Sequence, residues 1–251
     1  GLLTYGIPEF KLEKKIVHKR REILENLGVK FVLNFEVQAK ELSEIEDKYD
    51  AIFLGLGTYE SIKGDYKGFE KDGVVEALPY LTENTKYLMN ENDALSMDFK
   101  NQKVVVLGGG DTAMDCVRTA LRQGAKKVTC VYRRDFENMP GSRKEVKHAM
   151  EEGVEFLFNH QIVEAKGDDK LSELIAEETE LFGNDGSGRK KPKVKEGTQK
   201  KIELDKLVIA FGYQASPQEF FTNKKINVDD WGLIQLNLSL IHISEPTRPL
   251  Y

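Results

Sequence analysis

The residues best suited to chemistry form a glycine-rich turn. It follows the apolar run 104–107 and consists of Gly108, Gly109, Gly110, Asp111, Thr112 and Ala113. In this G-x-G-x-x-A pattern Gly108 allows a tight turn, Gly110 lets a phosphate approach the backbone, and Ala113 keeps the next helix close to the strand. Free N–H groups at the start of that helix, with its dipole behind them, attract anions. The pattern predicts a site for the pyrophosphate of a nicotinamide dinucleotide; a glycine turn that binds nothing is the alternative.

Two arginines after the next expected strand, Lys127–Tyr132, bear on which dinucleotide binds. An acidic residue at this strand end bonds the ribose 2′-hydroxyl of NAD, whereas arginines accommodate the 2′-phosphate of NADP. Arg133 and Arg134 therefore favour NADP, with Arg143 as a further candidate contact and Asp135 as an opposing acid. One charge-assisted hydrogen bond of about 1.5 to 3 kcal/mol can supply roughly tenfold to over a hundredfold preference. The alternative is a solvated loop.

Two more glycine turns end apolar runs, at residues 55–58 (GLGT) and 210–213 (AFGY). Glycine at a strand end lets the backbone pass close to a cofactor or a crossing strand. Taken by themselves, plain packing turns explain these two segments equally well.

The elements around the first glycine turn alternate between strand and helix. We expect strands at 103–107, 127–132 and 154–158, with helices at 111–122 and 142–152 between them. This order is that of a dinucleotide-binding half, in which the sheet is parallel. The short, glycine-split runs of 161–205 favour antiparallel hairpins, and 206–210 returns as an apolar strand.

The earlier part of the chain predicts another α/β unit. We expect a helix at 11–27 that ends at Gly28, strands at 29–33 and 51–57, and a helix near 78–89. The segment 238–251 fits no element and resembles the translated read-through of a sequencing adapter, so we exclude it from fold reasoning. This tail, together with Gly1 in place of a methionine, predicts a fragment that lacks both natural ends.

Composition excludes several classes of protein. The 251 residues are 40% hydrophobic and 31% charged, which is typical of a globular protein, and the net charge of −5 argues against nucleic acid or an anionic membrane as the main partner. No apolar run approaches the ~20 residues of a membrane helix. Cys116 and Cys130 form no Cys-x-x-Cys pair, and the four histidines lack ligand spacing, so we expect no metal site and a cytoplasmic protein with two buried thiols.

Four motifs together carry a family resemblance. They are the opening 1–12 (GLLTYGIPEFKL), 53–59 (FLGLGTY), 108–115 (GGGDTAMD) and 132–142 (YRRDFENMPGS). In this order they closely resemble the small subunits of NADPH-dependent glutamate synthases, over residues 1 to about 237.

The resemblance implies an α/β flavoprotein with two dinucleotide-binding domains, a Rossmann-like NADPH domain being inserted into an FAD domain. On this basis residues 1–70 are a partial FAD domain, 71–100 a connector, 101–215 the NADPH domain, 216–237 a return into the FAD domain, and 238–251 a non-native tail. In the family, hydride passes from NADPH to FAD and electrons continue through iron-sulfur clusters to a large subunit. That subunit makes glutamate from glutamine and 2-oxoglutarate.

The resemblance also assigns site residues. NADPH would be bound by residues of the glycine turn and the strand ends: Gly108, Gly109, Gly110, Asp111, Thr112, Ala113, Arg133, Arg134, Arg143, Ala210, Phe211 and Gly212. Gly6, Ile7, Val37 and Gly57 would lie along FAD. The family's flavin fingerprint and iron-sulfur cysteines would precede residue 1, and its Gly-Asp flavin motif would follow 237, so we expect this chain by itself to bind FAD weakly or not at all.

No side chain is expected to act as a catalyst, because hydride transfer between two cofactors depends on placement, which can account for about 7 to 11 kcal/mol of the barrier. Two rival functions remain. One is a paralogous flavin and iron-sulfur subunit that serves another acceptor, as in dihydropyrimidine dehydrogenase. The other is an NADPH-binding module without turnover. The match over residues 133–142 favours glutamate synthase.

Overall fold

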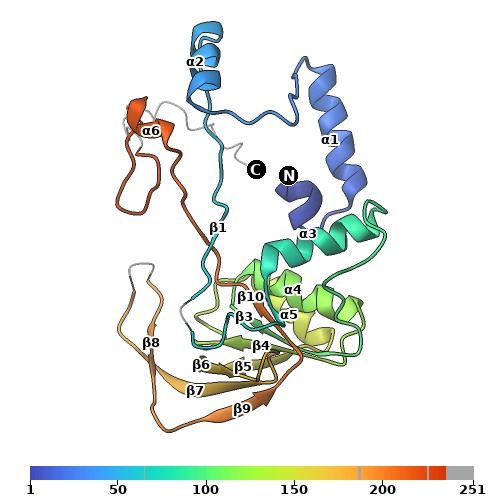
Figure 1. Ribbon diagram of the computed structural model, residues 1–251, viewed down its shortest axis with the longest axis vertical. Helices are drawn as coiled ribbons and strands as arrows, with labels where there is room; N and C mark the ends of the chain where they lie inside the picture. Colours follow the sequence, from blue (N-terminus) through green and yellow to red (C-terminus); the bar gives the residue numbers. More distant parts are fainter. Residues whose placement is uncertain (65, 186–187, 225, 236–251) are drawn as a thin grey trace, which may run out of the picture. The chain divides into compact units, whose positions relative to one another are not determined.

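The computed structural model describes the chain except for residues 65, 186–187, 225 and 236–251 (Figure 1). The chain divides into two compact units. The first unit comprises Gly1–Val29 and Ile62–Gly212, and the second comprises Lys30–Ser61 and Tyr213–Tyr251. The excluded tail, 238–251, lies outside the described residues.

A parallel sheet is the centre of the first unit. Among the described residues it has five strands in the order β2-β10-β3-β4-β5. Their bounds are Val74–Glu76 (β2), Lys103–Leu107 (β3), Lys127–Tyr132 (β4), Glu155–Phe158 (β5) and Lys206–Ile209 (β10). The strands expected at 103–107, 127–132, 154–158 and 206–210 are thus confirmed, and all pairs are parallel. The edge strand β2 was not expected, because three residues are too few to show a pattern.

Helices cover one face of this sheet (Figure 1). They are α3 (Ala77–Leu88), α4 (Asp111–Arg122) and α5 (Arg143–Glu151), close to the helices expected at 78–89, 111–122 and 142–152. In α4 the residues at helical spacing, Ala113, Val117 and Ala120, are fully buried against Val104 and Val128 of the sheet. The small side chains let the helix approach the sheet at the glycine turn.

An antiparallel sheet covers the opposite face. Its strands are β6 (His160–Lys166), β7 (Glu173–Phe182), β8 (Lys191–Val194) and β9 (Lys200–Glu203). β7 pairs with each of the other three, which confirms the hairpins expected in 161–205. A second core forms where Leu174 and Ile162 pack against Val105 and Leu207 of the parallel sheet. The first unit is therefore layered as helices, parallel sheet and antiparallel sheet.

The amino-terminal segment packs on α3 and α4. It contains a short π-helix, η1 (Leu2–Gly6), and the expected helix, α1 (Lys14–Asn26). The Phe10 ring lies under the guanidinium carbons of Arg118 and Arg122, at 4.6 and 3.9 Å from its centroid. Lys11 Nζ is 3.0 Å from Asp115 Oδ1. These contacts join the segment to α4.

The second unit is smaller. Its elements are α2 (Ala39–Lys48), β1 (Glu60–Ser61), β11 (Tyr213–Gln214) and α6 (Phe220–Asn223). β1 and β11 pair antiparallel, and Leu42, Phe220 and Phe221 form a small core. Within the described part of the chain, no helix combines the length and apolar character that a membrane span requires.

The strands expected at 29–33 and 51–57 are wrong. Neither segment pairs with a strand among the described residues, and most of their apolar side chains are exposed, with Phe53 94% accessible. A buried parallel strand needs a paired strand and a covered face, and among the described residues neither segment has a paired strand. Near residues 231–234 the structure has an isolated antiparallel bridge between Val228 and Ile234.

Candidate functional site

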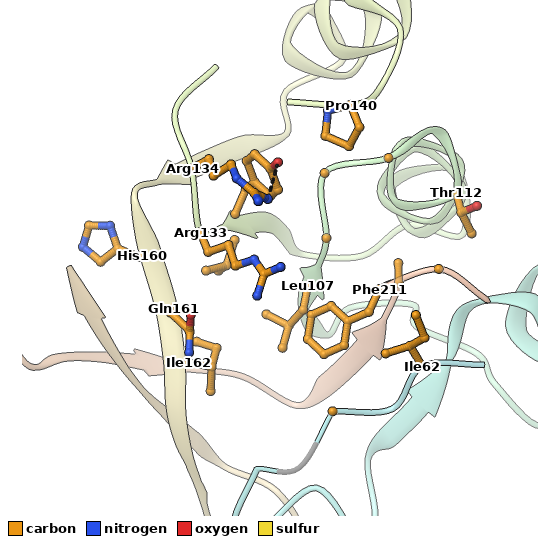
Figure 2. A pocket seen from close by; sticks show the side chains of 18 of the residues that line it. Ile62, Leu107, Thr112, Arg133, Arg134, Pro140, His160, Gln161, Ile162 and Phe211 are labelled. Atoms are coloured by element: carbon orange, nitrogen blue, oxygen red, sulfur yellow. Dashed lines mark hydrogen bonds between the residues drawn. The ribbon is translucent and has the colours of Figure 1, made fainter. Parts of the chain in front are cut away.

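A cavity of about 500 Å³ opens in the first unit where the parallel strands end (Figure 2). Most of the residues predicted to bind NADPH line it: Gly108, Gly109, Gly110, Thr112, Arg133, Arg134, Ala210, Phe211 and Gly212. They come from the carboxyl ends of β3, β4 and β10 and from the start of α4. Ligands of open α/β sheets bind at this edge, where the connections change direction.

The three glycines of the turn are required for different reasons. Gly108 has φ +142°, and a Cβ there would lie 2.2 Å from the Ala210 carbonyl oxygen. A Cβ at Gly109 would lie 2.5 Å from the Tyr132 ring. At Gly110 an added Cβ would meet no described heavy atom within 4 Å, so it would stand in open space. Gly108 and Gly109 thus serve packing, and Gly110 leaves room at the cavity, as a cradle for pyrophosphate requires.

The start of α4 presents backbone donors. The Met114 N–H donates to the Gly110 carbonyl at 3.2 Å, which is the first bond of the helix ladder. The N–H groups of the three residues before Met114 precede that ladder and carry the positive end of the helix dipole. Ala113 lies under this turn, fully buried.

Asp111 has a structural contact in addition to its place in the helix. Its Oδ1 accepts the Ser142 N–H at 2.8 Å, and the Gly141 N–H donates to the Gly109 carbonyl at 2.8 Å. These bonds hold the loop before α5 against the glycine turn. Pro140 of the same loop lines the cavity (Figure 2).

The two adjacent arginines have different environments. Arg133 is exposed, and Figure 2 shows its side chain directed into the cavity. Arg134 is only 5% exposed, and its guanidinium is bonded within the protein, to Asp185 Oδ2 at 2.8 Å and to the Lys190 carbonyl at 2.6 Å. The interior contacts of Arg134 could not be foreseen from two arginines in a row.

Arg143 does not lie among the described residues that line the cavity. Its guanidinium donates to the carbonyl oxygens of Phe136 and Glu137 and lies 4.4 Å from the Phe136 ring centroid. The structure therefore does not bring this candidate together with Arg133.

The residues predicted to lie along FAD are divided between the two units. Gly6 and Ile7 belong to the first, where Gly6 is buried and the Ile7 carbonyl accepts a hydrogen bond from Lys14 Nζ. Val37 and Gly57 belong to the second. Val37 packs on the small core of that unit, and Gly57 has φ +71°. None of these four residues lines the cavity described above.

The cavity also contains residues that the motifs did not indicate. His160 and Gln161 begin β6, and Arg189 precedes β8. His160 Nδ1 lies 2.7 Å from the Phe158 carbonyl oxygen, which orients the ring. His160 and Gln161 belong to the antiparallel sheet and Arg189 to the connection between two of its strands; the sequence of this region has hairpin signals but no nucleotide-binding pattern.

The two cysteines are buried and free. Burial raises the pKa of the Cys130 thiol to about 12, and it raises that of Cys116 as well. A thiol that resists ionisation is a poor nucleophile, so neither cysteine is suited to disulfide exchange. Among the described residues no group of three or more His, Cys, Asp or Glu side chains could hold a metal ion.

A family model described as pyridine nucleotide-disulphide oxidoreductase matches residues 14–242. The glutamate synthase [NADPH] small chain of Escherichia coli (strain K12) is 47% identical over 240 residues, covering 93% of this chain and 51% of that protein. The putative oxidoreductase AegA of the same organism is 43% identical over 255 residues, covering 99% and 39%. These relatives confirm the resemblance drawn from the motifs. The chain spans about half the length of the glutamate synthase small chains that it matches.

The fold is shared with a solved structure. Mycobacterium tuberculosis FprA in complex with NADPH superposes with a TM-score of 0.72 at 19% identity, covering 87% of this chain and 62% of FprA. The expected α/β fold class is confirmed by this similarity and by the parallel sheet.

Proposed function

Because the chain belongs to the pyridine nucleotide-disulphide oxidoreductase family, we propose that it is the NADPH-binding part of a glutamate synthase small subunit. The observation that carries the proposal is the cavity at the sheet edge. It combines an open backbone position at Gly110, the start of α4 and the cationic side chain of Arg133. This combination suits a pyrophosphate and a further phosphate on the same ligand.

The chain's own residues bind and orient the nucleotide. Gly110 and the first N–H groups of α4 would hold the pyrophosphate, and Arg133 would hold the 2′-phosphate. Phe211, whose ring lies 6.1 Å from that of Tyr66, adds an apolar wall that excludes water. When bound, NADPH supplies a hydride to a flavin. No acid or base of the chain is needed, since rate depends on placement.

The rest of the proposal concerns the whole protein. FAD would lie along Gly6, Ile7, Val37 and Gly57, in a flavin domain formed by residues 1–70 and 216–237 around the connector 71–100 and the NADPH domain 101–215. Iron-sulfur clusters would carry the electrons to a glutamate synthase large subunit in the cytoplasm. The support for this is the family and the name of the 47% identical relative.

Calorimetric titration with NADPH and with NADH tests the nucleotide preference. We expect NADPH to bind more tightly by about tenfold or more, because the 2′-phosphate adds a charge-assisted hydrogen bond. Equal affinity for both nucleotides would overturn the assignment of NADP to this site.

A second candidate function differs in the electron acceptor. The 43% identity to a putative oxidoreductase favours it, because the same nucleotide-binding part can serve another partner. Full-length protein should reduce a dye with NADPH in either case. Glutamate formation with the large subunit supports the first proposal. Dye reduction by a protein that forms no glutamate with the large subunit supports the second. NADPH binding without dye reduction would indicate a non-catalytic module.

A further inference from the structure

Arg134, which follows β4, binds the β7–β8 hairpin near its turn. The guanidinium donates from Nη2 to Asp185 Oδ2 at 2.8 Å and from Nε to the Lys190 carbonyl at 2.6 Å. A more distant contact, 3.5 Å, joins Nη1 to the Tyr132 hydroxyl (Figure 2). Because Arg134 is almost fully buried, these partners take up its donors inside the protein.

A second set of hydrogen bonds to the hairpin involves Asp135 and Asn138, which belong to the run 132–142. Asp135 Oδ1 accepts from the Asn138 backbone N–H at 2.8 Å and from Asn138 Nδ2 at 2.7 Å. Asn138 Oδ1 in turn accepts the Lys190 N–H at 3.0 Å. Three polar residues of the run 132–142 are thus engaged in docking the hairpin.

Asp185, which binds Arg134, also contacts Arg189. Its Oδ1 accepts the Arg189 N–H at 3.1 Å, and its Oδ2 lies 3.9 Å from Arg189 Nε. The Asp185 N–H donates to the Arg189 carbonyl at 2.6 Å. One carboxylate therefore lies between two guanidinium groups, and Arg189 lines the same cavity as Arg133.

We propose that Arg189, together with Arg133, binds the 2′-phosphate of the nucleotide, while Arg134 and Asp185 are positioning residues that hold Arg189 at the cavity. The proposal rests on the proposed function, since it names the residues that select NADPH. Arg133 and Arg189 both line the cavity, so together they present two guanidinium groups to a phosphate carrying up to two negative charges. The guanidinium of Arg134 is engaged in bonds inside the protein. The second cationic group at the cavity is therefore Arg189 of the hairpin.

The test measures how much the 2′-phosphate contributes to binding affinity, and it needs no flavin. Adenosine 2′,5′-bisphosphate and adenosine 5′-monophosphate are titrated calorimetrically into the full 251-residue chain. We expect Arg189→Met to weaken binding of the bisphosphate by about tenfold or more and to leave the monophosphate within about twofold. Lys193→Met, on the exposed face of the same hairpin, removes the same charge outside the cavity and should leave both ligands unchanged.

Asp185→Ala tests positioning through the sign of its effect. Removing a negative charge near an anion site normally strengthens anion binding. If Asp185 holds Arg189 in place, the variant instead weakens the bisphosphate selectively. Unchanged or tighter binding would overturn the positioning role. Circular dichroism confirms that each variant is folded.

The outcomes separate this inference from the proposed function. If the wild-type chain binds the bisphosphate no better than the monophosphate, both the NADPH assignment and the role of Arg189 fail. If the wild type prefers the bisphosphate but Arg189→Met behaves like Lys193→Met, the role of Arg189 fails and NADPH binding stands. Loss of preference in Arg189→Met, with the control intact, supports both.

Discussion

Alanine at Gly110 and alanine at Gly108 should have opposite consequences, although the two residues belong to one turn. Gly110 has φ −90° and ψ 176°, an extended conformation that any residue adopts, and an added Cβ meets no described atom within 4 Å. Gly108 has φ +142°, and its added Cβ would overlap the Ala210 carbonyl oxygen at 2.2 Å. The first substitution therefore changes the cavity and the second changes the fold.

The expected magnitudes follow from these contacts. Replacing a helix N-cap glycine by alanine costs roughly 0.5 to 1 kcal/mol, and the stiffer unfolded chain offsets about 0.4 to 1 kcal/mol of this. Gly110→Ala should therefore leave stability within about 1 kcal/mol. By occupying the cradle it should cost at least one charge-assisted hydrogen bond to pyrophosphate, or roughly tenfold to over a hundredfold in Kd. Gly108→Ala should cost about 1 to 3 kcal/mol through backbone strain, with the overlap adding to this.

Thermal unfolding and calorimetry with NADPH check both variants. At about 2 to 4 °C per kcal/mol for a chain of this size, Gly108→Ala should lower Tm by roughly 2 to 12 °C, and Gly110→Ala should scarcely change it. The reasoning is refuted if Gly110→Ala binds NADPH as tightly as the wild type, or if it lowers Tm as much as Gly108→Ala.

Hydrogen bonds from Arg122 and Arg118 lower the pKa of Glu152 from 4.5 to about 2, so this carboxylate stabilises the fold above about pH 4.5 and the stabilisation is lost as the pH falls toward 2. Because solvent screens this partly exposed ion pair, Glu152→Gln should reduce the free energy of unfolding at neutral pH by about 1 kcal/mol and flatten the acid limb of the stability profile; an unchanged acid limb in urea titrations would contradict this. Arg143→Met should reduce NADPH affinity less than Arg133→Met in calorimetry, because the Arg143 guanidinium is bonded to loop carbonyls; an equal loss would restore Arg143 as a contact. The purified chain should carry little FAD, since the apolar segment around Phe53 is exposed, and visible flavin absorbance after gel filtration would refute this.

Much of the fold around the glycine turn could be predicted because its signals are local. Asp111–Arg122 and Lys127–Tyr132 were expected with the bounds that the structure gives. Strand length, helix periodicity and a glycine between them are properties of neighbouring residues. The segments 29–33 and 51–57 have the same apolar character, but whether such a run becomes a strand depends on a pairing partner elsewhere in the chain.

The sequence by itself determined that a strand, a glycine turn at 108–110 and a helix follow one another, because each of these depends on neighbouring residues, and this arrangement can bring backbone N–H groups to a phosphate. It also placed arginines beside that turn. Only the tertiary structure decided which arginine has its guanidinium bonded inside the protein and which is exposed at the cavity. Arg134 is turned inward by Asp185, a residue 51 positions later, and the same hairpin brings Arg189 to the cavity. The packing of the antiparallel sheet against the parallel one sets these contacts, and no spacing along the chain encodes them.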